Sequence, residues 1–190
     1  MSDFNREKAI ALLNTYVTSP HIIPHSFALE AVMRALAKKL SPENEEMWAM
    51  AGLLHDLDYD LVDWKTDMSL HGFTAIEILK QVNFGNEEMY HAILAHNAET
   101  GAKIASPLDR AIYAADPITG FIAAIAKVYP DQKIKSVKVK SIVKRMSEVR
   151  FAASANREAM LSIERLNITF PDFAALSLAA MCEIADVLDL

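Results

Sequence analysis

Two adjacent residues, His55 and Asp56, carry side chains well suited to bind a metal ion. They close an apolar stretch at residues 48–54. On a regular helix neighbouring side chains point about 100° apart, because the helix has 3.6 residues per turn. At a helix end the backbone turns away, and an imidazole and a carboxylate can converge on one point. Such a pair suits a divalent transition metal. Taken alone, it is more often a buried histidine that is hydrogen-bonded to its neighbour.

Three more histidines and one aspartate occupy comparable places in the sequence. Two of these residues open expected helices, one closes a helix and one precedes a proline: His25, His71, His96 and Asp116. Side chains at the ends of different helices can meet at one edge of a bundle. His91 lies roughly 140° around its helix from His96, and His21 lies in a loop, so both are excluded from this group.

The elements that must position these residues are all expected to be helices. Apolar residues at helical spacing predict helices near residues 10–17, 25–40, 42–54, 71–82, 87–96, 107–115, 139–146, 160–166 and 173–187. Ser2 or Asp3 is expected to cap the first helix and Ser41 the third, and Pro24 is expected to lie outside a helix. Pro117 either kinks its helix or begins another. No segment alternates at period two, so the predicted fold class is all-α, a single helical bundle without a β-sheet.

Composition favours one globular domain over residues 1–190. The chain is 52% hydrophobic and 23% charged, with 5 Gly and 7 Pro. Its single Cys182 rules out an intramolecular disulfide and suits a reducing cytoplasm. The start has no apolar signal core, and the longest near-apolar stretch is too short to span a bilayer. These features predict a cytoplasmic protein, and a net charge of −6 disfavours nucleic acid as a partner.

Three short motifs connect the chain to a known family. They are His25-Ser26-Phe27-Ala28, Gly52-Leu53-Leu54-His55-Asp56 and Ala114-Ala115-Asp116-Pro117. With this order, His, His-Asp, Asp, the sequence resembles the HD-domain superfamily of metal-dependent phosphohydrolases. The likeness covers roughly residues 21–128 and implies an HD-type metal-binding core there. Residues 129–190 are then expected to form C-terminal helices that pack on this core.

The resemblance also implies a set of metal ligands. The residues that match the ligands of one ion are His25, His55, Asp56 and Asp116. His71 and His96 match the further histidines of members that bind two ions, in which the aspartate of the pair bridges the ions. The expected cofactor is one or two divalent transition metal ions, of Fe, Mn, Zn, Co or Ni. Tyr59 stands where some members carry a glutamate, so the family assigns no general acid here.

The function implied is hydrolysis of a phosphoester, in a small phosphorylated molecule and most plausibly a nucleotide, by metal-activated water. Asp56 belongs to this catalytic centre, and Asp58 and Asp60 follow closely enough to act as a general acid or to orient the water. The alternative for Asp58 and Asp60 is a pair of solvated loop carboxylates. Two other functions stay open: a di-iron oxygenase resembling myo-inositol oxygenase, and a non-catalytic binding domain.

Several cations are candidates to bind a substrate phosphate. Lys65 lies in the loop after the His-Asp pair, and residues 133–150 are rich in lysine and arginine. Within that segment the first candidates are Lys144, Arg145 and Arg150, and Arg157 is a weaker one. The alternative is a solvated helix face. A small phosphorylated substrate is thus the expected partner, a membrane is not, and the sequence is compatible with a homo-oligomer.

Overall fold

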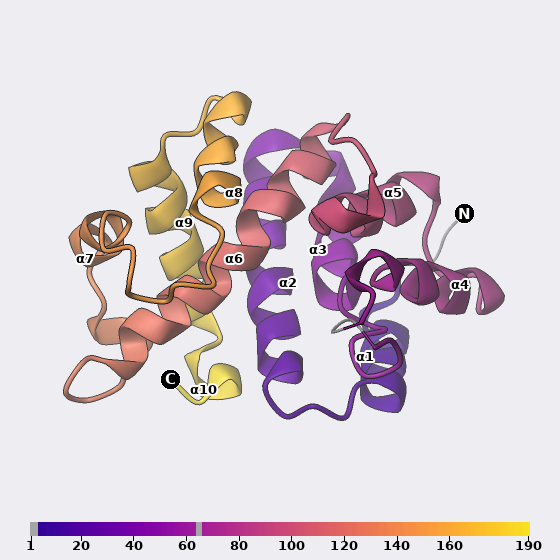
Figure 1. The fold of residues 1–190 in the computed structure, drawn as a ribbon, viewed down its shortest axis with the longest axis horizontal. Helices are drawn as coiled ribbons and strands as arrows, with labels where there is room; N and C mark the ends of the chain where they lie inside the picture. The colour runs from indigo at the N-terminus through magenta and orange to yellow at the C-terminus, as the bar shows by residue number, and fades with distance from the viewer. Residues whose placement is uncertain (1–3, 64–65) are drawn as a thin grey trace.

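The computed structural model describes residues 4–63 and 66–190, and these residues form α-helices joined by loops and short 3₁₀-helices (Figure 1). No strand occurs in the two described ranges, which confirms the all-α class. The first five helices are α1 (Arg6–Tyr16), α2 (Ile22–Leu40), α3 (Glu45–Leu54), α4 (Phe73–Gln81) and α5 (Glu87–His96). The later helices are α6 (Pro107–Lys127), α7 (Val139–Arg145), α8 (Arg157–Leu161), α9 (Phe170–Glu183) and α10 (Ala185–Leu188).

Helices α2 and α3 pack closely in the middle of the molecule. Leu29 and Met33 of α2 are fully buried against this interface. A Cβ atom on Gly52 of α3 would lie only 2.8 Å from the carbonyl oxygen of Leu29. Glycine therefore allows the two backbones to approach, and a larger residue would push α3 away. This approach brings the end of α3, with His55, beside the first turn of α2.

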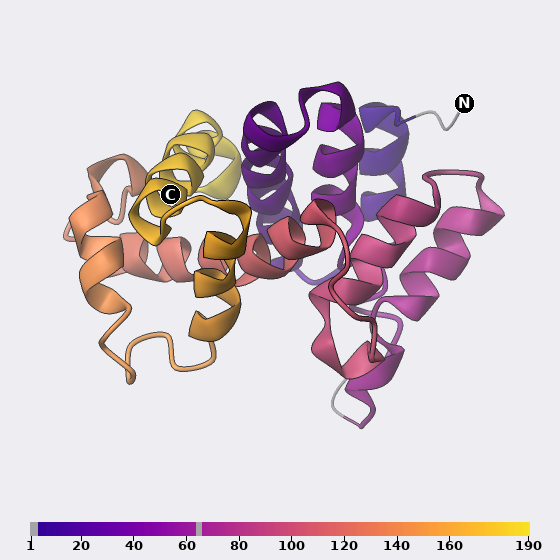
Figure 2. The same cartoon turned by 90° about the horizontal axis from the view of Figure 1, so that it is seen from above.

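Helix α6 runs from beside α5, near the middle of the molecule, to the end where α7 lies (Figures 1 and 2). Its start is fixed by a capping box. The side chain of Ser106 accepts a hydrogen bond from the backbone N–H of Asp109, and the side chain of Asp109 accepts one from the backbone N–H of Ser106. Helix α6 packs on α2, α5, α8 and α9. Pro117 neither begins a new helix nor ends this one, because Ala114, Ala115 and Ile118 on either side are buried and hold the helix together.

The last third of the chain surrounds the C-terminal half of α6 (Figure 2). Phe173 of α9 is fully buried, and α9 contacts both α2 and α7. Arg157, at the start of α8, donates hydrogen bonds to five main-chain carbonyls within residues 146–155. Its guanidinium group therefore fixes the loop that precedes α8.

Helix starts differ from the sequence prediction at three places. Asn5 caps α1 by accepting the N–H of Lys8 at 2.9 Å, whereas Ser2 and Asp3 lie outside the described residues. Pro24 lies inside the first turn of α2, where its missing N–H would have had no helical partner. Ser41 makes no capping bond and precedes a 3₁₀-helix, Pro42–Asn44, before α3 begins. In neither described range does a helix combine the length and the apolar character that crossing a bilayer requires.

Candidate metal centre

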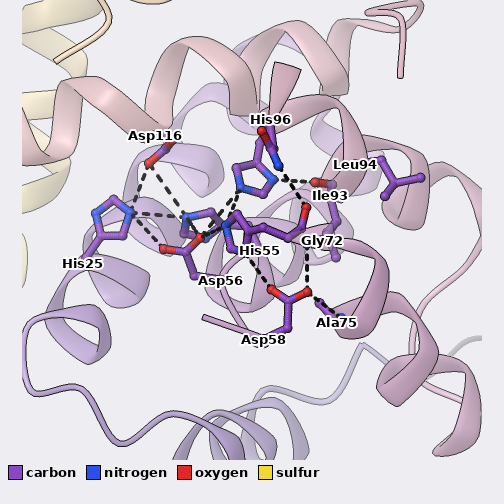
Figure 3. Close-up of polar contacts among 12 residues, drawn as sticks. His25, His55, Asp56, Asp58, Gly72, Ala75, Ile93, Leu94, His96 and Asp116 are labelled. Atoms are coloured by element: carbon purple, nitrogen blue, oxygen red, sulfur yellow. Dashed lines mark hydrogen bonds and ion pairs between the residues drawn. The ribbon is translucent and has the colours of Figure 1, made fainter. Parts of the chain in front are cut away.

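Six histidine and aspartate side chains from different elements converge at one point (Figure 3). His25 lies in the first turn of α2, and His55 and Asp56 directly follow α3. His71 lies just before α4, His96 is the last residue of α5, and Asp116 lies near the middle of α6. The predicted site residues of the His-Asp group are thus brought together, five of them at or beside helix ends and Asp116 from within α6.

One side of the centre consists of His25, His55 and Asp116. The Nε2 atom of His25 lies 3.2 Å from Nε2 of His55 and 3.0 Å from Oδ1 of Asp116. Nε2 of His55 lies 3.8 Å from the same carboxylate oxygen. Three potential ligand atoms are therefore close enough to one another to hold a single ion.

The other side consists of His71 and His96, with Asp56 between the two sides. Oδ1 of Asp56 lies 3.0 Å from Nε2 of His71 and 3.7 Å from Nε2 of His96. The two histidine nitrogens are 3.2 Å apart. Asp56 also reaches the first side, with Oδ1 at 3.2 Å from His55 and Oδ2 at 3.7 Å from His25. Its carboxylate therefore faces all four imidazoles.

Main-chain carbonyls orient two of the imidazoles. Nδ1 of His55 lies 2.9 Å from the carbonyl oxygen of Gly52, and Nδ1 of His96 contacts the carbonyl oxygen of Ile93. A carbonyl oxygen only accepts hydrogen bonds, so each Nδ1 carries the proton and donates it. In the neutral ring this leaves a lone pair on Nε2, which points into the centre. This arrangement is typical of metal-binding histidines.

Side chains orient the other two imidazoles. Nδ1 of His71 lies 2.8 Å from Oδ1 of Asp58, which accepts its hydrogen bond. Nδ1 of His25 lies 3.0 Å from the hydroxyl of Thr119, and this hydroxyl donates at 2.8 Å to the carbonyl of Asp116. The hydroxyl thus accepts from His25. All four histidines therefore turn Nε2 towards the two carboxylates.

His55, Asp56, His71 and His96 are buried, whereas His25 and Asp116 are partly exposed, and the charges of the centre shift one another's pKa values. Burial by itself would raise the pKa of Asp56, but His55, His71 and His25 outweigh it and hold this pKa well below its usual value. Burial would lower the pKa of His71, but Asp56 and Asp58 raise it to about 10. Burial and the neighbouring His55 lower the pKa of His96 to about 4. The two carboxylates of the centre, Asp56 and Asp116, therefore demand a compensating positive charge.

The ligand atoms fit a divalent transition metal. Four imidazole nitrogens and two carboxylates form a mixed nitrogen and oxygen set, which suits Fe, Mn, Zn, Co or Ni better than the all-oxygen sites of Ca²⁺. A bound cation would neutralise the carboxylates and take the Nε2 lone pairs, and it would displace the proton of His71. The residues present therefore fit one ion or two.

Two cavities open onto this centre. One, of about 390 Å³, is lined by Asp56, His71 and His96 together with Tyr113 and Asn156. The other, of about 500 Å³, shares His96, Tyr113 and Asn156 and extends along the loop before α8. The sequence prediction missed Tyr113 and Asn156. Tyr113 could have been found from the sequence, because it lies one helical turn before Asp116. Asn156 could not, because its position depends on how the C-terminal third of the chain folds back.

The two further acidic candidates lie outside these cavities. Asp58 is fully buried, and besides His71 its carboxylate accepts the N–H groups of Gly72 at 2.8 Å and Ala75 at 3.0 Å. Asp60 is exposed and accepts the N–H groups of residues 18 and 19 at 2.7 and 2.8 Å. Their catalytic roles stay predictions, and the contacts of Asp58 favour a positioning role.

The predicted cationic residues do not line either cavity. Lys144 and Arg150 are exposed. Arg145 pairs with Glu148 at 2.9 Å, and its guanidinium lies 4.2 Å from the centre of the Phe151 ring. Lys65 lies outside the described residues. The substrate-binding role of these residues remains a prediction.

Comparison with known families identifies the fold that carries this centre. The model of the HD domain matches residues 22–120, which is more than half of the chain and includes all six converging side chains. Neither curated proteins nor solved structures give a match to the sequence. The family match does not distinguish one bound ion from two. The chain belongs to the HD-domain family, whose members bind divalent metal ions and generally act as metal-dependent hydrolases.

Proposed function

We propose that this protein is a phosphohydrolase that uses a metal centre to cleave a phosphoester in a small phosphorylated molecule, with nucleotides as the favoured class. The observation that carries the proposal is the convergence of four oriented Nε2 atoms on the carboxylates of Asp56 and Asp116 beside a cavity of about 390 Å³. A cavity of this size suits a small molecule.

In this proposal His25, His55 and Asp116 would hold one ion. His71 and His96, together with Asp56, would hold a second. When bound, such ions supply hydroxide near neutral pH, by lowering the pKa of water from 15.7 towards about 7, and offset negative charge on a phosphoryl group.

The protein's own residues orient and enclose the reaction. Thr119 and Asp58 keep the imidazoles of His25 and His71 turned inward through their Nδ1 atoms. Tyr113 and Asn156 line the cavities and are placed to contact the substrate beyond its phosphate. Asp58 is a positioning residue in this proposal, because its buried carboxylate already has three donors.

A substrate screen tests the proposal. The protein, stripped by a chelator and reloaded with each candidate metal, is offered nucleoside monophosphates, cyclic nucleotides and simple phosphoesters. We expect phosphate release or diester opening that depends on the added metal and is absent from Asp56→Asn. A metal-loaded, folded protein that cleaves none of these phosphoesters would contradict the proposal.

A second function, a di-iron oxygenase, is favoured by one observation. His71 and His96 complete a set of four histidines around Asp56, as the two-ion arrangement requires. Iron as the bound metal, together with oxygen consumption on addition of a substrate, would support this function. Hydrolysis supported by a redox-inactive ion such as Zn²⁺ would exclude it as the main activity.

A further inference from the structure

A third and larger cavity lies beside the metal centre. Its volume is about 790 Å³, and it lies between the loop before α6, the first turns of α6 and the segment around α8. Tyr113 lines this cavity and both cavities of the metal centre, and Ala98 lines this cavity and the smaller of the two. The third cavity therefore adjoins the site of the proposed reaction.

Three cations line this cavity. The side chains of Lys103, Arg110 and Arg165 make no hydrogen bond or ion pair with any residue in the described ranges, although Glu158 and Glu164 also line the cavity. Arg110 is half-buried, and burial and the nearby charge of Arg165 lower its pKa. Two guanidinium groups that repel each other beside a cavity favour an anion between them.

Three other arginines, Arg6, Arg34 and Arg145, provide a contrast. Arg6 and Arg34 pair with Glu30, and Arg145 pairs with Glu148. In those places the fold supplies a carboxylate for each guanidinium. At Arg110 and Arg165 it does not, so the fold leaves these cations available to a ligand.

Helix α6 sets the distance between this cluster and the metal centre. Arg110, Tyr113 and Asp116 follow one another at intervals of three residues, which places them along one side of the helix. At 1.5 Å per residue, the backbone positions of Arg110 and Asp116 are about 9 Å apart along the axis. A ligand that reaches both ends must therefore extend along the ring of Tyr113.

We propose that Arg110, Arg165 and Lys103 bind a second anionic group of the substrate, so that the substrate is an extended dianionic phosphoester with its two anionic groups about 10 Å apart. The inference rests on the proposed function for the identity of the first group, which lies at the metal centre. It goes beyond that function by defining what the other end of the substrate carries.

A series of phosphonates tests the inference with no need for turnover. The metal-loaded protein is titrated with straight-chain alkyl phosphonates and with terminal alkane bisphosphonates of the same chain lengths, from propane to decane. We expect the bisphosphonate to bind roughly tenfold or more tightly than the matched monophosphonate, with a maximum at one intermediate length. In Arg110→Gln/Arg165→Gln this preference should disappear, while metal content stays unchanged.

Two controls make the result specific. Lys133→Gln/Lys140→Gln removes the same charge from exposed lysines that line none of the three cavities, and it should keep the preference. The single variant Arg165→Gln changes an exposed side chain and should lose part of the preference with the fold intact.

Equal binding of the two series by the parent protein at every length would overturn the inference, as would an unchanged preference in the folded Arg110→Gln/Arg165→Gln variant. These outcomes are distinct from failure of the proposed function. A protein that releases no phosphate in the substrate screen but retains the length-dependent preference refutes hydrolysis and supports the second anionic site.

Discussion

Two buried carboxylates in this protein, Glu30 and Asp56, have very different partners. Glu30 is 4% exposed, and Arg6 donates to both its oxygens at 2.5 and 2.9 Å while Arg34 lies 3.5 Å away. Asp56 is 7% exposed, and its Oδ1 lies 3.0 Å from Nε2 of His71 and 3.2 Å from Nε2 of His55. Arginine carries a permanent charge, whereas an imidazole is charged only when it is protonated.

The difference separates an ion pair that is complete within the chain from a site that needs an ion from outside. Glu30 is neutralised by the fold itself. Asp56 and Asp116 are neutralised either by protons on histidines or by a bound cation. A buried carboxylate among inward-turned imidazoles is therefore the feature that distinguishes a metal centre from a structural ion pair.

The largest effect is expected from removing each carboxylate in turn. Asp56→Ala should lose bound metal and activity together while the protein stays folded, because the helices pack through other residues. Glu30→Gln should keep full metal content but lower the free energy of unfolding by about 2 kcal/mol, since it removes the charged partner of Arg6. Elemental analysis and denaturant unfolding of both variants measure the contrast. Metal loss in Glu30→Gln, or normal turnover in Asp56→Ala, would contradict the distinction between a structural ion pair and a metal centre.

The next effect concerns the number of ions. His71→Ala/His96→Ala should lower the metal content by about one ion per chain and leave the ion at His25, His55 and Asp116 in place. The matched control, His21→Ala, changes a histidine outside the centre and should leave the stoichiometry unchanged. Full metal content in the double variant would show that the centre holds a single ion.

A smaller effect is expected at Asp58. Asp58→Asn removes the charge that holds Nδ1 of His71 and should weaken metal binding about 10- to 100-fold, the usual range for a residue that orients a ligand. Asp60→Asn, two residues away on the exposed loop, should leave metal affinity unchanged. Competition with a chelating dye measures both. Equal affinities for the parent and Asp58→Asn would show that the bond at 2.8 Å does not support the ligand.

The smallest effect is expected from the basic segment. Because Lys144, Arg145 and Arg150 line none of the cavities at the metal centre, replacing all three by Gln should change KM by less than about fivefold, in keeping with the 0–1 kcal/mol of exposed charge interactions. Steady-state kinetics with the best phosphoester of the screen measure KM for the parent protein and for the triple variant. A rise in KM of tenfold or more would place this segment at the substrate, as the sequence predicted.

The helices and the six converging side chains could be predicted because both depend on local pattern. Apolar spacing marked the helices. The His-Asp pair and the other three histidines of the centre lie at or beside helix ends, whereas Asp116 lies within α6. Boundaries were less predictable. Pro24 and Pro117 both suggested helix breaks. Pro24 lies in the first turn of α2, where a backbone N–H has no helical partner. Pro117 lies inside α6, where buried residues on both sides hold the helix together.

The parts of the site that were not predictable depend on long-range packing. Arg110 and Arg165 meet at one cavity only because residues 157–166 fold back onto α6. Asn156 reaches the metal centre for the same reason. The support that Asp58 gives to His71 was also hidden, because an aspartate in a polar loop reads as exposed until the fold buries it.

Unfolding of the chelator-treated protein with and without added metal tests the central claim most directly. An ion that binds the folded chain at a hundred times its Kd should raise the free energy of unfolding by about 2.7 kcal/mol. We expect this increase in the parent protein and in Glu30→Gln, and none in Asp56→Ala. An equal increase in Asp56→Ala, or no increase in the parent with any of the five candidate metals, would contradict a metal centre at these residues.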